Sequence, residues 1–167
     1  MRLLVQAGWV IILPRKGYLV RPLGLDDIRE VFALRRMLEP TLTAEAARRA
    51  TDASIARLHA LQESQASTET DFDHITASAR DFHLLIAELS GNGRALQILT
   101  GLIDEVIRLL HLMPRLEENL RSVAELEAHD RIVEAIAQRD ADGAADLMRA
   151  HLVVAGRGMT QAFADGT

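Results

Sequence analysis

Histidines are the residues of this 167-residue chain that are best suited to bind a ligand or a metal, and the chain holds six of them. Three, His83, His129 and His151, fall on the apolar faces of three different expected helices. Helical bundles build metal sites from facing helices, and imidazole is the commonest protein ligand of borderline divalent metals. Three neutral imidazoles could therefore hold a metal and leave room for a small anion. The alternative for each is a buried histidine with a hydrogen-bond partner.

The other three histidines share no such face, and His74 is expected to point to solvent because it is half a turn out of phase with His83. The pattern leaves the metal and the plain buried interpretation both open.

Arg35 and Arg36 offer a second kind of chemistry, on the first long expected helix. An arginine aimed into a bundle could clamp a carboxylate through two parallel hydrogen bonds. The alternative is a solvated pair whose aliphatic stems pack along the helix. Periodicity alone slightly favours this second interpretation for each arginine.

The elements that would position these residues are helices from Asp26 onward. Apolar residues recur at helical spacing over six segments, near 26–50, 51–63, 71–89, 94–112, 116–139 and 144–163. Pro40 predicts a kink or local break in the first segment, and the polar stretches 64–70 and 140–143 predict a loop and a turn. Short connections of this kind predict an all-α antiparallel bundle of six to seven helices. The broad apolar face of 94–112 is typical of a central or interface helix.

The first 22 residues follow a different pattern. Leu3, Leu4 and Ala7-Gly8 are typical of a helix end, and two β-rich runs, 8–13 and 18–22, flank the turn residues 14–17. This predicts a β-hairpin ahead of the bundle. Such a segment is too short to fold alone, so we expect it to be part of a larger unit.

Composition narrows the function classes. The chain is 49% hydrophobic but only 4% aromatic, which favours a core of aliphatic side chains on helices. It has no cysteine, which excludes disulfides and thiolate metal sites. The formal net charge of −5 argues against a free-standing nucleic-acid-binding domain. Neither a secretory signal nor a membrane span is evident, so we expect a cytoplasmic protein.

Four stretches together resemble the FadR subfamily of GntR-type transcription regulators and their C-terminal effector domain, the FCD domain. They are Gly8-Trp9-Val10 with Pro14-Arg15-Lys16-Gly17-Tyr18, Arg35-x-x-Leu38-Glu39-Pro40, Phe82-His83 followed by Ser90-Gly91-Asn92, and His129 followed after 22 positions by His151-Leu152. The resemblance covers essentially the whole chain. It implies that 1–22 are the remnant of a winged helix-turn-helix and 25–167 an effector-binding helical domain.

The resemblance also implies a site. Many members bind a divalent metal, such as zinc, nickel or manganese, through three histidines and one carboxylate, and the histidines carry over to His83, His129 and His151. The carboxylate usually lies one turn before the first histidine, where this chain has Ala79, and Asp81 falls on another helix face. A water, the effector's own carboxylate, or no metal at all remain as alternatives. Arg35 matches an arginine expected beside the effector.

The implied function is ligand-responsive transcription control without enzymatic activity. A small organic acid would bind in the bundle and alter DNA binding by a homodimer, and no membrane is expected as a partner. Arg15 and Lys16 would contact DNA phosphates, or they are simply turn residues. Because the recognition helix of a winged helix-turn-helix precedes its wing, we expect this chain to be a truncated regulator that does not bind an operator specifically.

Two rival functions remain at this point. The first is a helical metal-dependent hydrolase that uses the three-histidine site, with Asp81 and Glu88 as candidate general bases by sequence proximity. The second is a structural dimerisation module, which predicts neither metal nor effector.

Overall fold

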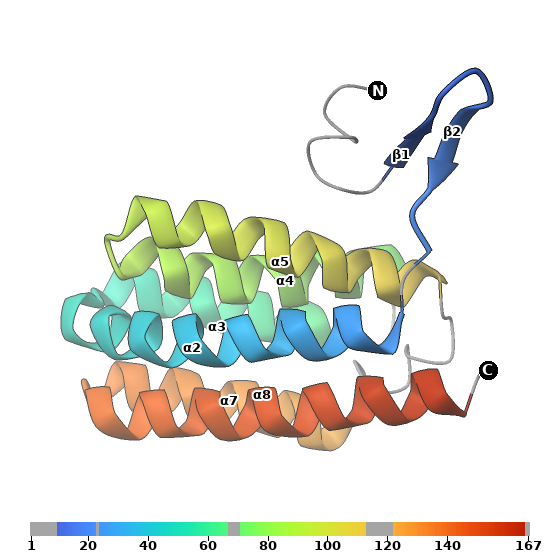
Figure 1. Cartoon of the computed structure of the whole chain (residues 1–167). Coiled ribbons are helices and arrows are strands. Elements are labelled where there is room, and N and C mark those ends of the chain that lie inside the picture. The colour runs from blue at the N-terminus through green and yellow to red at the C-terminus, as the bar shows by residue number, and fades with distance from the viewer. Residues whose placement is uncertain (1–9, 23, 67–70, 113–121, 166–167) are drawn as a thin grey trace.

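The computed structural model describes residues 10–22, 24–66, 71–112 and 122–165. Over this part of the chain, six helices with roughly parallel or antiparallel axes pack into a bundle, and a β-hairpin extends from it at the N-terminal side (Figure 1). The helices are α2 (Leu25–Arg49), α3 (Asp52–Ala66), α4 (Phe72–Leu89), α5 (Gly93–Leu112), α7 (Val123–Ala137) and α8 (Ala141–Ala164). The all-α class with a preceding hairpin is therefore confirmed.

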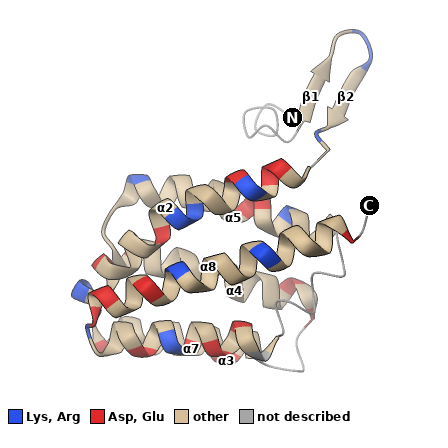
Figure 2. Cartoon of the chain, turned by 60° about the horizontal axis from the view of Figure 1, so that its bottom comes forward, with Lys and Arg blue, Asp and Glu red and all other residues tan. Residues whose placement is uncertain are grey.

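The hairpin consists of β1 (Val10–Leu13) and β2 (Gly17–Val20), paired antiparallel with Val10 opposite Val20. Its turn is tight, and Gly17 has a φ of 101°, a conformation that glycine adopts without strain. All of β2 is exposed. Basic residues lie at the turn, whereas charges of both signs are scattered over the helices (Figure 2). The role of the hairpin as a wing stays a prediction, and the helix end predicted at residues 3–8 lies outside the described residues.

Side-chain caps decide where several helices begin. Asp71 accepts a hydrogen bond from the backbone N–H of His74, and Ser122 accepts one from Glu125. Asp140 accepts a hydrogen bond from the backbone N–H of Gly143 and caps α8, which begins at Ala141. The predicted turn at 140–143 is therefore wrong, because residues 141–143 already belong to the helix. Side-chain caps of this kind stabilise a helix start because they satisfy its free N–H groups.

Two further expectations about helix limits need correction. The predicted loop at 64–70 is wrong for residues 64–66, because α3 continues to Ala66. The predicted break at Pro40 is also wrong, since α2 is continuous past this residue. Proline removes one backbone donor and crowds the preceding turn, but Pro40 is buried among the bundle's helices, whose packing holds the helix together. Of the helix predicted at 116–139, the described part is α7, and residues 113–121 lie outside the described residues.

The core divides into two clusters. The larger one runs through the bundle and includes the close contact of α2 with α8, where a Cβ at Gly156 would lie only 3.0 Å from the Phe32 ring. The smaller one, here called the dry cluster, joins α2, α4 and α5 and consists of Leu42, Ala87, Ala95, Leu99 and Ile103. Among the described residues, no helix is long and apolar enough to cross a membrane.

Candidate metal and anion site

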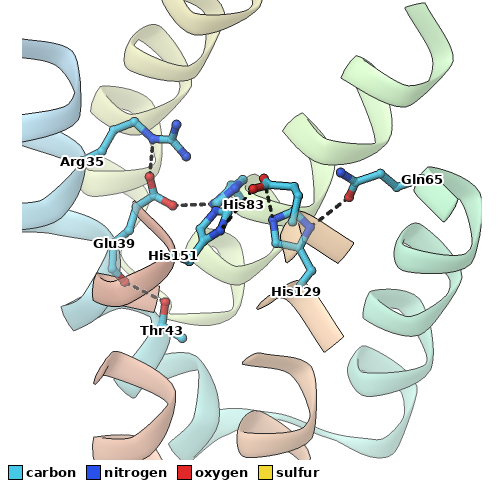
Figure 3. A network of polar contacts seen from close by, with 8 residues as sticks. Arg35, Glu39, Thr43, Gln65, His83, His129 and His151 are labelled. Carbon is cyan, nitrogen blue, oxygen red and sulfur yellow. Dashed lines mark hydrogen bonds and ion pairs between the residues drawn. The ribbon is translucent and has the colours of Figure 1, made fainter. Parts of the chain in front are cut away.

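The three predicted histidines come together in the middle of the bundle. His83 of α4, His129 of α7 and His151 of α8 each offer a ring nitrogen, and these nitrogens all lie within 4.8 Å of one another (Figure 3). Their exposed fractions are 6%, 1% and 5%. By contrast, His74 is exposed and contacts Ser64, and His111 is exposed beside Asp73. Helical periodicity thus separated buried histidines from surface ones.

His83 is held by a carboxylate that the sequence reasoning missed. Glu39 of α2 accepts from Nδ1 of His83 at 2.6 Å, and its other oxygen accepts from Nε of Arg35 at 2.5 Å. Burial alone would raise the pKa of Glu39, but Arg35 and His83 outweigh it and lower that pKa to about 2. The signal that could have found Glu39 is its position four residues after Arg35, on the same helix face. An ionised Glu39 fixes the proton of His83 on Nδ1.

His129 is oriented from its opposite side. Gln65 of α3 accepts from Nδ1 of His129 at 2.9 Å, and the Phe82 ring stacks on the imidazole with centroids 4.1 Å apart. Nε2 of His129 is buried and has no hydrogen-bond partner within the described part of the chain. Burial, together with the neighbouring His151 and His83, holds the pKa of His129 well below its usual value. The ring is therefore neutral, with the lone pair of Nε2 facing the cluster.

A second missed carboxylate, Glu125 of α7, lies against the other two histidines. Its Oε1 is 3.6 Å from Nε2 of His129, and its Oε2 is 3.6 Å from Nδ1 of His151. Burial raises the pKa of Glu125 to about 7, partly opposed by Arg35. Burial, followed by the neighbouring His83 and Arg35, lowers the pKa of His151 to about 3. We call Arg35, Glu39, His83, Glu125, His129 and His151 the polar centre.

A small pocket opens beside the polar centre. It has a volume of about 70 Å³. Its polar lining is Arg35, Arg80, His83, Glu125 and His151, and its apolar lining is Phe32, Ala79, Ile103, Val106, Ile107, Leu110, Ala155 and Met159. Arg35 is buried, and its two terminal nitrogens point away from Glu39 (Figure 3). Arg36 instead borders a separate surface hollow between α2 and α8.

The residues present fit a divalent metal. Ligands of a tetrahedral zinc site lie roughly 3.3 Å apart, given Zn–N distances of about 2.0–2.1 Å, so nitrogens within 4.8 Å of one another need only small rotations to meet one ion. The lowered pKa values of His129 and His151 keep both imidazoles neutral, so they require no deprotonation before they coordinate. Nε2 of His129, which has no hydrogen-bond partner among the described residues, is a buried lone pair, and this is unfavourable unless a ligand or proton meets it.

The other sequence-derived candidates lie away from the polar centre. Asp81 is exposed and pairs with Arg80, and Glu88 is exposed and pairs with Arg57. Neither lines the pocket. Arg15 and Lys16 are exposed in the turn of the hairpin.

Comparison with known proteins places this arrangement in a family. The family model described as the FCD domain matches residues 30–153. The chain is 32% identical over 137 residues to the HTH-type transcriptional repressor NanR of Citrobacter rodentium. The matched region covers 82% of this chain and 52% of that protein. NanR of Salmonella newport is 31% identical over 137 residues, and the match again covers 82% of this chain and 52% of that protein. The chain thus spans about half the length of these curated relatives.

Solved structures show the same fold. The Escherichia coli protein McbR/YncC superposes with a TM-score of 0.78 at 21% identity, over 93% of this chain and 81% of that one. A GntR protein of Streptococcus agalactiae superposes with a TM-score of 0.63 at 25% identity. The superposition covers 93% of this chain and 78% of that protein. Because the relatives found are transcription regulators, the hydrolase alternative has no support. The chain belongs to the FCD domain family of GntR-type transcription regulators.

Proposed function

We propose that this bundle is the effector-sensing part of a DNA-binding transcription regulator, and that it binds a small carboxylate anion in the pocket beside Arg35. The observation that carries the proposal is a buried guanidinium that lines a pocket together with His83 and His151. Glu39 uses only one nitrogen of Arg35 in the described contacts. The terminal nitrogens can therefore offer a carboxylate two parallel hydrogen bonds.

A divalent metal, zinc, nickel or manganese, completes the site in this proposal, held by His83, His129 and His151. When bound, it supplies positive charge and open coordination positions for oxygens of the acid. Glu39 and Gln65 orient two of the imidazoles, as carboxylate and carbonyl groups do for many metal-binding histidines. The polar end of the pocket favours the carboxylate end of a ligand, and the apolar walls favour its carbon atoms.

The size of the pocket limits the ligand or requires movement. About 70 Å³ is well below the roughly 300–1,000 Å³ of pockets that hold drug-sized ligands. A larger acid would have to separate α2, α5 and α8. Such a ligand would bind the widened form better than the closed form, and this difference in affinity is what allosteric control requires.

The same helices hold the end of the hairpin. Arg108 of α5 donates to the backbone carbonyl of Arg21 at 2.6 Å, and Arg21 pairs with Asp27 in the first turn of α2. A shift of α2 relative to α5 would therefore alter how the hairpin is attached. In the complete regulator, a cytoplasmic homodimer, this shift would reposition the DNA-binding parts, with Arg15 and Lys16 as phosphate contacts. Exposed Ile98 on α5 fits a dimer surface on this helix.

The test is ligand binding by calorimetry and thermal shift with a panel of short hydroxy and oxo acids. Arg35→Lys keeps a cation opposite Glu39 but loses the planar fork, and we expect binding about tenfold weaker. The matched control is Arg36→Lys on the neighbouring helix position, which should bind like the wild type. Equal binding by Arg35→Lys and the wild type would exclude the arginine clamp.

Metal content provides a separate test. By inductively coupled plasma mass spectrometry, we expect about one zinc, nickel or manganese ion per wild-type chain after loading, and none in His129→Ala. Wild-type protein that takes up no metal would leave the histidines as hydrogen-bonding core residues.

A further inference from the structure

The geometry points to Glu125 as the fourth protein ligand of the metal, so that the site consists of three histidines and a carboxylate from the same helix as His129. This inference rests on the proposed metal. The two oxygens of Glu125 face nitrogens on two different helices, Nε2 of His129 and Nδ1 of His151, both at 3.6 Å. One carboxylate thus spans the opening between two candidate ligands.

The separations are those of ligands around one ion, not those of hydrogen bonds. At 3.6 Å, a carboxylate oxygen and an imidazole nitrogen are too far apart for a hydrogen bond between charged or neutral partners. Ligands of a tetrahedral ion lie roughly 3.3 Å apart. Because each oxygen of Glu125 faces a different nitrogen, the carboxylate would have to bind with both oxygens, or rotate to present one of them, to share an ion with His129 and His151.

The protonation of His129 makes the contact unfavourable without a cation. Its Nδ1 carries the proton that Gln65 accepts, so Nε2 presents a lone pair. When Glu125 is ionised, its Oε1 presents lone pairs as well. Two acceptors that face each other in a buried place repel, and Nε2 has no other partner among the described residues. A metal ion between them would convert this repulsion into two coordination bonds.

The fold leaves Glu125 available and keeps it in position. Both oxygens of Glu39 are already engaged, one by Arg35 and one by His83. Glu125 lies in the first turn of α7, where Ser122 accepts from its backbone N–H at 3.2 Å and fixes that turn. It precedes His129 by four residues, so the two side chains share one face of the helix.

The donor set has a consequence for the ligand. A carboxylate ligand neutralises one of the two charges of the ion, so the site with Arg35 remains positive overall while being less costly to bury. Four protein ligands leave an octahedral ion, such as nickel or manganese, two further positions. Those two positions suit an acid that chelates through its carboxylate and a neighbouring hydroxyl or carbonyl oxygen.

The test is the zinc affinity of the chain, measured by competition with a chromophoric chelator. We expect Glu125→Gln to bind zinc at least tenfold more weakly than the wild type. Glu134→Gln is the matched control, because Glu134 is an exposed carboxylate on the same helix, and it should bind like the wild type. The visible absorption of cobalt(II) bound to the protein should also change in Glu125→Gln, since a ligand is lost.

The outcomes separate this inference from the proposed metal. Wild-type protein that binds zinc, with Glu125→Gln equal in affinity and in cobalt(II) spectrum, overturns the role of Glu125 and leaves the three-histidine site standing. Wild-type protein that binds no zinc overturns both. If Glu125→Gln does not fold, a crystal structure of zinc-loaded wild type decides: an oxygen of Glu125 at about 2.0–2.2 Å from the ion supports the assignment, and one beyond 3 Å overturns it.

Discussion

Apart from the half-buried Glu125, the polar centre is as buried as the dry cluster in the same bundle, yet the two regions are built from opposite chemistry. Two helices pass from one region to the other within about one turn. On α2, Glu39 is followed three residues later by Leu42. On α4, His83 is followed four residues later by Ala87. The same backbone positions a dry contact and a charged network side by side, so burial by itself does not distinguish a structural core from a binding site.

The difference is energetic. Leu99 and its neighbours are stabilised by the removal of apolar surface from water. The Arg35–Glu39 pair must first lose its hydration, and apolar replacements of buried ion pairs are often neutral or stabilising. If the network contributes little net stability, a ligand explains its presence better than folding does. This difference can be tested by changing one region at a time.

The largest expected effect is that of Glu39→Ala. It leaves Arg35 buried without its partner and His83 without its acceptor, so we expect a loss of about 3–5 kcal/mol in the free energy of unfolding. Urea denaturation followed by circular dichroism measures this loss. The double variant Arg35→Met with Glu39→Leu removes both charges and should regain most of the stability while losing acid binding. If the double variant is as unstable as Glu39→Ala, the ion pair is a net source of stability.

Leu99→Ala probes the dry cluster. The side chain is fully buried, and its truncation should cost about 2–4 kcal/mol through lost burial and a residual cavity. In contrast to changes in the polar centre, zinc and acid binding should be unchanged at a temperature where the variant is folded. Denaturation and calorimetry on one preparation give both values. A parallel loss of binding would show that the two regions are coupled.

Acidification should weaken the metal-free bundle through the polar centre. The pKa values of His129 and His151 are lowered on folding, so the unfolded chain binds more protons below its ordinary histidine pKa of 6.5. Stability from these two groups is complete above pH 6.5 and is lost as the pH falls toward the folded pKa values. Each contributes about 1.4 kcal/mol per pH unit in this window.

Glu125 acts in the opposite direction. Its pKa is raised to about 7, so the folded state binds a proton that the unfolded state lacks between pH 7 and about 4.5. It gains stability over that range and offsets one of the two histidines. We therefore expect a net loss of roughly 2–3 kcal/mol between pH 6.5 and 4.5, measured by urea denaturation in a chelator. Stability that is flat across this range would show that the histidines are accessible to protons when folded.

The sequence was informative where periodicity and residue type agreed. Apolar spacing predicted the helices, and it also placed His83, His129 and His151 inward, because an imidazole on an apolar stripe is conspicuous. Glu39 and Glu125 were not found, since a charged residue on a helix is normally assigned to solvent. Their burial depends on partners from other helices, and no local pattern encodes those partners.

Gln65 was missed for a different reason. It lies in the polar stretch that favoured a loop at 64–70, whereas α3 extends to Ala66 and turns Gln65 inward to His129. Composition describes the average environment of a segment, but the last turn of a helix can place one polar side chain inside. Helix limits are fixed by such tertiary contacts and by caps such as Asp140 more than by composition.

The smallest expected effect is that of Gln65→Leu. It tests whether a buried polar side chain that orients a metal-binding histidine differs from one that only makes a structural hydrogen bond. Loss of the acceptor for Nδ1 of His129 should cost about 1 kcal/mol in the free energy of unfolding. It should lower zinc affinity by about tenfold, because the imidazole is no longer held in the orientation and tautomer that present Nε2. Gln62→Leu on the same helix is the matched control: Gln62 is also buried but donates to Asp130. It should cost similar stability and leave zinc affinity unchanged, and an equal loss of zinc affinity in both variants would reduce the role of Gln65 to packing.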